Sequence, residues 1–279
     1  MEDVTTISAE RLGEGSPIRV EVLPTEEDLY WDIARLIMST VRANEEAGKP
    51  TVLILPVGPV GQYPRLARLC NLERLSLRNL WCFNMDEYLT EAGEWIPMED
   101  PLSFRGHMKR NLLDLLDAEL APPAEQVVFP DARDPQKPWL MMQDLGGVDA
   151  CYGGIGINGH IAFNEPPEPG VEMSVEEFAE LPTRVLELAR ETRTINSFTV
   201  ADGNIPRIPR TAITLGMREI LAAREIRLYG NRIWQRAIVR RVLHGPVTPQ
   251  VPCSLVQLHP NASLTLAEFV AEPPRGRLA

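Results

Sequence analysis

The chain has 279 residues and a formal net charge of −11, with 44% hydrophobic and 24% charged residues. A chain of this length can bury a sizeable core, and the composition is that of an ordinary globular protein. The acidic balance argues against a broad interface with nucleic acid or an anionic membrane. It still allows a small anionic substrate, because a local group of arginines can bind one phosphate inside an acidic protein.

The N-terminus and the cysteines predict a cytoplasmic protein in a reducing setting. The first residues lack a basic start followed by a long apolar run, so they do not form a signal peptide. The most apolar stretch, Thr51–Gly61, is short and contains two prolines, so it cannot span a bilayer. None of the four cysteines belongs to a C-x-x-C pair or matches a zinc spacing, which favours buried free thiols and no metal site.

Helix and strand patterns alternate along the chain. Residues 1–24 are expected to form a loosely held arm with a short strand at Ile18–Val22. Thr25 then has the character of a helix cap, followed by acids and by apolar residues at helical spacing up to Val41. Further strands are expected at Thr51–Leu55, Leu80–Phe83, Val148–Ile157, Glu225–Tyr229 and Ser263–Leu266, and further helices near residues 63–71, 103–117 and 232–243.

This alternation predicts the α/β fold class. Strands that alternate with helices form a mostly parallel sheet covered on both faces. The sequence contains no repeat and no linker, so residues 1–279 are expected to form a single Rossmann-like domain. Residues 166–182, rich in Pro and Glu, are expected to form an exposed excursion, and residues 273–279 a frayed tail.

The loops that follow the predicted strands carry the chemistry. Ligands of open α/β sheets bind beyond the carboxyl ends of the strands. Those ends are followed by the loops Pro56–Gly61, Asn84–Tyr88, Asn158–His160 and Gly230–Arg232. Together they contribute a glycine-bearing loop, two carboxylates, a histidine and an arginine, which are the components of an acid–base site.

Two acids and one histidine are the candidate proton carriers. Asp86 lies at the predicted crevice, whereas the adjacent Glu87 is more simply explained as a cap of the following turn. Glu165 follows His160 by five residues across a short loop, a spacing that allows a hydrogen bond to the imidazole. The remaining histidines are interpreted as structural or surface residues: His107, His244 and His259.

The glycines of Gly154–Gly159 match the dinucleotide fingerprint only formally. That fingerprint has to open a helix. Here the chain soon reaches Glu165 and two prolines, which would end a helix almost at once. NAD binding is therefore not expected, and no other cofactor is expected either.

At these residues the chain resembles the glucosamine-6-phosphate deaminase (isomerase) family. The resemblance runs from Thr51 to Leu266, and its most specific part is Gly159–Pro166. Other matching runs are Phe83–Tyr88, Ser103–Phe104, Arg110–Asn111, Thr192–Arg193, Asn196–Ser197, Ala212–Gly216 and Gln257–Pro260. The related 6-phosphogluconolactonases do not usually carry the Asn-Met-Asp-Glu-Tyr and Phe-Asn-Glu-Pro runs together.

The resemblance implies a fold like that of the sugar-phosphate isomerases and CoA transferases, and the conversion of an amino-sugar phosphate to a ketose phosphate and ammonia. In that reaction Asp86 would move a proton from C2 to C1. His160, held by Glu165, would open the sugar ring, with Asn158 standing where many members have Asp and others also have Asn. Substrate contacts are expected from Gly58, Gly61, Glu87, Gly159, Arg193 and Arg232.

The phosphate-binding positions depart from the family. Members usually have a hydroxyl- and glycine-rich loop, whereas Val57–Gly61 has no hydroxyl and Pro59 has no N–H donor. Ile233 stands where members carry a lysine. Either Arg232 and Arg193 hold the phosphate in a rearranged pocket, or the substrate lacks a 6-phosphate or carries another group there.

Three functions are therefore open. The first is an amino-sugar phosphate deaminase. The second is a sugar lactonase on the same fold, which would need no C2 base, so Asp86→Asn would barely affect it. The third is a non-catalytic sugar-binding protein, which would explain the altered loop but has no need of Asp86, His160 and Glu165 together. The expected partner is a small phosphorylated sugar, not nucleic acid or a membrane, and the oligomeric state, a homo-oligomer included, is not determined.

Overall fold

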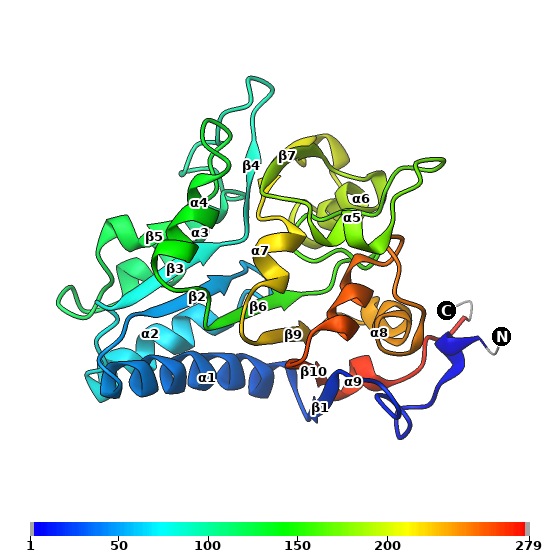
Figure 1. The fold of residues 1–279 in the computed structure, drawn as a ribbon, viewed down its shortest axis with the longest axis horizontal. Helices are drawn as coiled ribbons and strands as arrows, with labels where there is room; N and C mark the ends of the chain where they lie inside the picture. The colour runs from blue at the N-terminus through cyan, green and yellow to red at the C-terminus, as the bar shows by residue number, and fades with distance from the viewer. Residues whose placement is uncertain (1–2, 277–279) are drawn as a thin grey trace.

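A seven-stranded sheet is the central feature of the computed structural model, which describes residues 3–276 (Figure 1). The strand order is β1-β10-β9-β6-β2-β3-β5, and every pairing in this sheet is parallel. Its strands are β1 (Arg19–Leu23), β2 (Thr51–Leu55), β3 (Leu80–Asn84), β5 (Val127–Val128), β6 (Ala150–Gly154), β9 (Ile226–Gly230) and β10 (Ala262–Ala267). The expected α/β fold with a mostly parallel sheet is confirmed.

Helices cover both faces of this sheet, because its central strands carry apolar side chains on both sides. Along β2, Val52 and Ile54 belong to one buried cluster, while Leu53 and Leu55 belong to another. The helices α1 and α2 pack on the Leu53 side, and α4, α7, α8 and α9 contribute to the opposite cluster. The helices are α1 (Glu26–Glu46), α2 (Gln62–Glu73), α3 (Phe104–Asn111), α4 (Lys137–Asp144), α5 (Val175–Ala179), α6 (Arg190–Val200), α7 (Met217–Leu221), α8 (Gln235–His244) and α9 (Glu268–Ala271).

The first long helix begins at the cap that the sequence predicts. The Thr25 hydroxyl accepts a hydrogen bond from the Asp28 N–H, and the Asp28 carboxylate accepts one from the Thr25 N–H. The chain before it is held more firmly than expected, because β1 pairs with β10 and the Ile7 carbonyl accepts a hydrogen bond from Arg240. Residues 273–276 form no helix or strand, and the rest of the expected tail lies outside the described residues.

A second sheet of three antiparallel strands was not expected from the sequence. It has the order β4-β8-β7, with β4 at Asp86–Leu89, β8 at Thr211–Thr214 and β7 at Arg184–Glu187. Only Met85 separates β3 from β4, so the expectation of a loop from residue 84 to 88 is wrong. The cause is that β4 is four residues long and buried throughout, so it shows no alternation. Asp86 consequently lies where the two sheets meet.

The Pro- and Glu-rich segment is largely the exposed excursion that was expected. Residues 168–172 are exposed, but α5 lies further along the segment and buries Phe178. All four cysteines are buried and free, as expected. Within residues 3–276, no helix is both long and apolar enough to cross a membrane.

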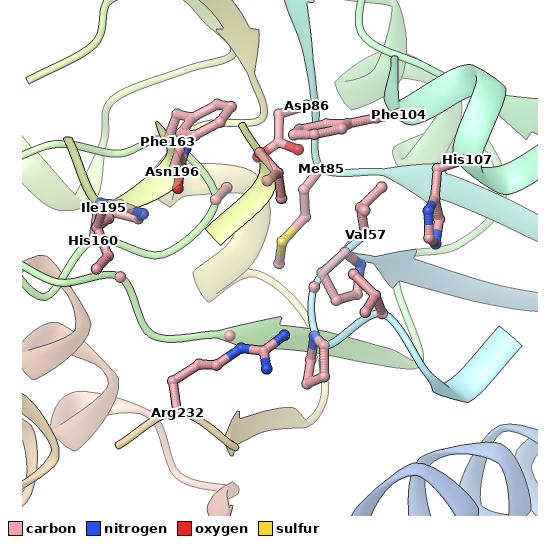
Figure 2. A pocket seen from close by; sticks show the side chains of 18 of the residues that line it. Val57, Met85, Asp86, Phe104, His107, His160, Phe163, Ile195, Asn196 and Arg232 are labelled. Carbon is pink, nitrogen blue, oxygen red and sulfur yellow. The ribbon is translucent and has the colours of Figure 1, made fainter. Parts of the chain in front are cut away.

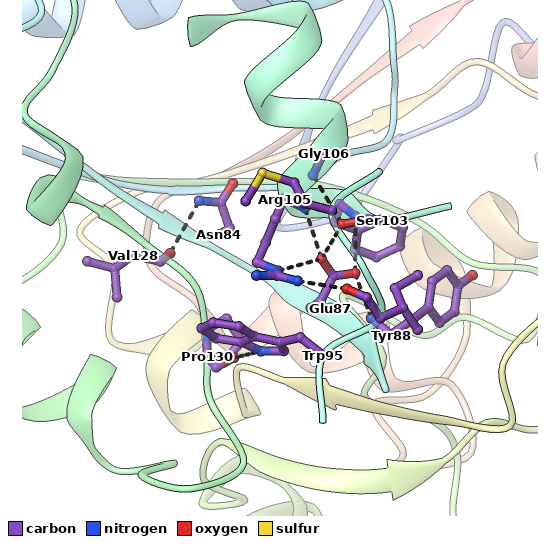
Figure 3. Close-up of polar contacts among 12 residues, drawn as sticks. Asn84, Glu87, Tyr88, Trp95, Ser103, Arg105, Gly106, Val128 and Pro130 are labelled. Atoms are coloured by element: carbon purple, nitrogen blue, oxygen red, sulfur yellow. Dashed lines mark hydrogen bonds and ion pairs between the residues drawn. The ribbon is translucent and has the colours of Figure 1, made fainter. Parts of the chain in front are cut away.

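A buried carboxylate fixes α3 to the second sheet (Figure 3). Glu87 is fully buried and accepts hydrogen bonds from the Ser103 hydroxyl at 2.9 Å and from the N–H groups of Phe104 and Arg105 at 3.1 and 2.9 Å. The Arg105 side chain also donates to it at 3.3 Å and lies 4.4 Å from the centroid of the Trp95 ring. A carboxylate at a helix N-terminus satisfies free amides and interacts favourably with the helix dipole. Glu87 therefore sets the position of α3.

Replacing Glu87 by Ala is expected to destabilise the fold by about 3–5 kcal/mol, because it leaves the first amides of α3 and the half-buried Arg105 without their partner. Urea unfolding should show a lower midpoint with an unchanged slope. The matched control is Glu187→Ala, which removes an exposed ion pair with Arg210 and should change stability by less than about 0.5 kcal/mol. Equal effects of the two substitutions would contradict the role given to Glu87.

Candidate active site

A cavity of about 340 Å³ lies beyond the carboxyl ends of the central strands. Its wall includes Gly58 after β2, Asp86 after β3, His160 after β6 and Arg232 after β9 (Figure 2). These residues are far apart in the sequence and meet because parallel strands place their carboxyl ends at one edge of the sheet. The two predicted proton carriers, Asp86 and His160, therefore face the same cavity.

Asp86 contributes a carboxylate in a nearly dry environment. Successive residues of a strand point to opposite sides, so Asp86 faces the cavity while Glu87 faces α3. Only 7% of Asp86 is exposed. Burial raises the pKa of Asp86 well above its usual range, and the negative charge of the neighbouring Glu87 adds to the rise. Its carboxylate is therefore a stronger base than that of an exposed aspartate.

Three oxygen atoms surround Nδ1 of His160. This nitrogen lies 2.8 Å from the side-chain oxygen of Asn158, 3.3 Å from the carboxylate of Glu165 and 3.2 Å from the hydroxyl of Thr192. The side-chain N–H of Asn158 in turn donates to Glu165 at 2.7 Å. Such surroundings favour the tautomer with its proton on Nδ1, which leaves Nε2 as the nitrogen available for proton transfer.

Glu165 places a negative charge behind the histidine, at the contact that the sequence spacing suggests. Burial by itself raises the pKa of Glu165, but the charge of His160 and hydrogen bonds from His160, Asn158 and Thr192 outweigh it, so the pKa is lowered. The N–H of Ala189 donates to the same carboxylate at 3.3 Å. An ionised Glu165 therefore lies against Nδ1 and orients the imidazole.

The imidazole ring lies against Gly156. A Cβ atom at this position would come within 2.1 Å of both Cε1 and Nε2 of His160. The Gly156 N–H also donates to the His160 carbonyl at 2.9 Å, which closes the turn. The glycine pattern here thus serves to seat the histidine. No helix begins at this turn, since the helix that follows β6 is α5, from Val175 to Ala179.

Three of the expected substrate contacts do not line the cavity because they serve the backbone or a helix terminus. Glu87 is enclosed at the start of α3 and does not line the cavity. Gly61 lies against Tyr30, where a Cβ atom would come within 2.4 Å of the ring. Gly159 has a φ of +88° and lies close to Val251, which leaves 2.8 Å between an added Cβ and that side chain.

The two arginines expected at the phosphate lie in different places. Arg232 lines the cavity and forms an ion pair with Glu26 at 3.8 Å. Arg193, on α6, does not line the cavity, and its buried Nε has no hydrogen-bond partner among the described residues. The side chain of Ile233, at the position where lysine was expected, is 63% exposed. Of the two expected arginines, Arg232 therefore lines the cavity and Arg193 does not.

A glutamine that no sequence motif marked fixes the loop carrying Arg232. The side-chain oxygen of Gln235 accepts hydrogen bonds from the N–H groups of Asn231 and Arg232, both at 2.8 Å. Its side-chain N–H donates to the Ile155 carbonyl at 2.7 Å. Gln235 is buried and thus ties the loop after β9 to the loop after β6.

Three aromatic rings form one wall of the cavity. The centroids of Tyr88 and Phe104 are 4.9 Å apart, and the Phe163 centroid lies 5.5 and 6.0 Å from them. The Tyr88 hydroxyl accepts a hydrogen bond from Asn196 at 3.0 Å. Because these rings come from β4, from α3 and from the turn after His160, no local pattern in the sequence could have shown them together.

His107, on α3, also lines the cavity, which corrects its interpretation as a structural or surface residue. The other two histidines agree with that interpretation. His244 accepts a hydrogen bond from the Gly13 N–H at 3.1 Å, and His259 contacts the Ala223 carbonyl at 2.8 Å. Among the described residues, no group of three His, Cys, Asp or Glu side chains is placed to hold a metal ion.

The chain is similar to named proteins over most of its length. No family model matches the chain. A glucosamine-6-phosphate deaminase of Parabacteroides distasonis is 30% identical over 258 residues, which are 90% of this chain and 89% of that protein. A glucosamine-6-phosphate deaminase of Rhodopirellula baltica is 31% identical over 267 residues, or 91% of this chain and 95% of that protein.

Solved structures with a similar fold include a member of the same family. A monomeric glucosamine-6-phosphate deaminase superposes with a TM-score of 0.77 at 26% identity, over 91% of this chain and 99% of that one. A 6-phosphogluconolactonase of Trypanosoma brucei reaches 0.64 at 18% identity, over 91% and 97% of the two chains, and so shares the fold.

Fold and site together define an α/β protein with a carboxylate and an oriented imidazole in one cavity, the arrangement of an acid–base enzyme. The identity to the relatives extends over nearly the whole chain. The chain belongs to the glucosamine-6-phosphate deaminase family.

Replacing Gly156 by Ala is expected to push the His160 ring out of its seat, because the ring is held at Nδ1 and cannot move aside freely. Turnover of amino-sugar substrate should fall about 100-fold, the lower end of the usual contribution of a positioned acid–base group. Steady-state kinetics measures the loss, and circular dichroism checks the fold. Gly276→Ala, where an added Cβ meets nothing within 4 Å, is the control and should leave turnover unchanged.

Proposed function

We propose that the protein converts glucosamine 6-phosphate, or a close analogue, and water to the ketose phosphate and ammonia. The observation that carries the proposal is that Asp86 and the oriented His160 face one cavity in a member of the glucosamine-6-phosphate deaminase family. The direct contact of Asn158 and Glu165 with the imidazole supports the same reaction, because a binding protein has no need to fix a tautomer.

Ring opening is the first step, and His160 performs it. Its Nε2 takes the proton of the C1 hydroxyl and returns it to the ring oxygen, so that an open-chain aldehyde forms. The proton on Nδ1 stays with Asn158 and Glu165 throughout. Glu165, whose pKa is lowered, remains ionised and stabilises the imidazolium that exists between the two proton transfers.

Proton transfer between C2 and C1 follows, with Asp86 as the base. The aldehyde makes the neighbouring C–H acidic, so the carboxylate removes the C2 proton while O1 takes a proton from solvent, which leaves an enolamine. The same carboxylic acid then returns its proton to C1, and C2 becomes a protonated imine. Water adds to the imine and ammonia leaves, so that a ketone stands at C2. Positioning and proton transfer supply the rate without a cofactor.

The assay that tests the proposal follows ammonia release from glucosamine 6-phosphate. Wild-type protein should release ammonia and form the ketose phosphate in equal amounts. Asp86→Asn should lower kcat by about 10²- to 10⁴-fold, the usual contribution of a general base. Hydrolysis of a sugar lactone without any ammonia release would instead place this chain with the lactonases, and in that case Asp86→Asn would have little effect.

The same substitution is expected to stabilise the protein at neutral pH. The pKa of Asp86 is raised by folding, so its ionised form is favoured in the unfolded chain and costs stability once the pH exceeds the unfolded pKa of about 4. An amide of the same shape removes that charge. Thermal unfolding should therefore give a higher Tm for Asp86→Asn than for wild type at pH 7, and the difference should shrink toward pH 4. A lower Tm at pH 7 would contradict a raised pKa.

The pH dependence of kcat/KM provides an independent check. Asp86 acts as a base only when ionised, so activity should fall as the pH is lowered through its raised pKa, with a midpoint above pH 4. The titration of the substrate phosphate, with a second pKa of about 6, has to be measured separately and subtracted. A profile that stays flat down to pH 4 would exclude Asp86 as the base.

A further inference from the structure

The end of the cavity next to the glycine loop contains few of the groups that usually hold a phosphate. Val57 and Val60 bring no hydroxyl, and Pro59 brings no N–H. Among the described residues that line the cavity, Arg232 is the single arginine or lysine. A phosphate bound beside Arg232 alone would lack donors on its other side.

His107 brings a donor to this end of the cavity. Its ring lines the cavity from α3, and in Figure 2 the loop that carries Val57 lies between Arg232 and His107. The side-chain N–H of Asn111 lies 3.2 Å from Nδ1 of His107 and 3.0 Å from the His107 carbonyl oxygen. Because Nδ1 accepts this hydrogen bond, the ring proton resides on Nε2.

The Nε2 atom of His107 is buried and has no hydrogen-bond partner among the described residues. Buried polar groups without a partner are rare in folded proteins, and those found in a cavity wall are commonly satisfied by a ligand or by an ordered water. The ring also packs edge-on to Tyr63, with centroids 6.1 Å apart, so its position is fixed by packing as well as by Asn111.

The ring is uncharged at neutral pH. Burial lowers the pKa of His107 to about 4, and the positive charge of Arg110 lowers it further. A neutral N–H donor can bind a phosphate oxygen and adds no charge to the cavity, so Arg232 alone supplies the cationic contact there.

We propose that His107 is a specificity-determining residue whose Nε2–H donates, directly or through one ordered water, to the phosphate of the substrate. This inference rests on the proposed deaminase function and extends it, since it assigns the phosphate contact to a residue of α3. It also means that Glu87, by holding α3, positions the phosphate contact while Asp86 beside it performs the chemistry.

The test compares phosphorylated and free amino sugar in variants at this position. His107→Phe keeps the ring and removes both nitrogens, so KM for glucosamine 6-phosphate should rise about tenfold with kcat changed less than about twofold, as expected for one lost hydrogen bond. KM for free glucosamine should not change. His107→Gln retains a donor, so its KM for glucosamine 6-phosphate should rise at most half as far, on a logarithmic scale, as that of His107→Phe. The matched control is His244→Phe, the same change on α8 outside the cavity, which should leave both KM values unchanged.

Two outcomes would overturn the inference. In one, His107→Phe leaves KM for glucosamine 6-phosphate within about twofold of wild type, below the effect of a typical hydrogen bond. In the other, it raises KM equally for both sugars, which would mean that the ring only packs the wall. Should the protein release no ammonia from any amino sugar, calorimetric titration with inorganic phosphate still tests the contact. Binding weakened about tenfold by His107→Phe would support the inference, and unchanged binding would reject it.

Discussion

The hydrogen bonds between the Glu87 carboxylate and the first turn of α3 are the constraint on which the rest of the site depends. They join the strand that carries Asp86 to the helix that carries Phe104 and His107. Because neighbouring residues of β4 point to opposite sides, one residue of this pair is buried to hold a helix and the other is left facing the cavity. The position of the candidate base and the shape of the wall opposite it are thus set by one dipeptide.

A second, separate network fixes the imidazole. Nδ1 of His160 is surrounded by three oxygens, and its ring lies against a glycine that leaves no room for a side chain. The two networks come from different elements of the fold, because Glu87 belongs to β4 and His160 follows β6. The carboxylate and the imidazole can therefore keep opposite electrostatic surroundings within one cavity. Burial raises the pKa of Asp86, whereas charge and hydrogen bonds keep Glu165 ionised behind His160.

The cavity has an acid–base part and a part with few groups that could hold a phosphate. Asp86 and His160 face it, while the loop after β2 is apolar and Arg193 is not among the residues that line it. Arg232 pairs with Glu26 and lies in the loop that Gln235 braces, and in Figure 2 the separate loop that carries Val57 lies between Arg232 and the uncharged His107. The chemistry and the recognition of the phosphate end thus depend on different elements of the fold.

The sequence by itself determined the fold class, the main helices and parallel strands, and the candidates Asp86, His160 and Glu165, because hydrophobic periodicity and the rule for strand ends are local properties. It did not show the second sheet, since β4, β7 and β8 are only four residues long and β4 pairs with β8 across more than a hundred positions. Nor could it separate the lining His107 from the remote His244. Which side of a strand or helix faces the ligand is decided by packing between distant segments. Only the tertiary structure therefore established that Glu87 caps α3, that Gly156 seats the histidine and that Arg232 lines the cavity whereas Arg193 does not.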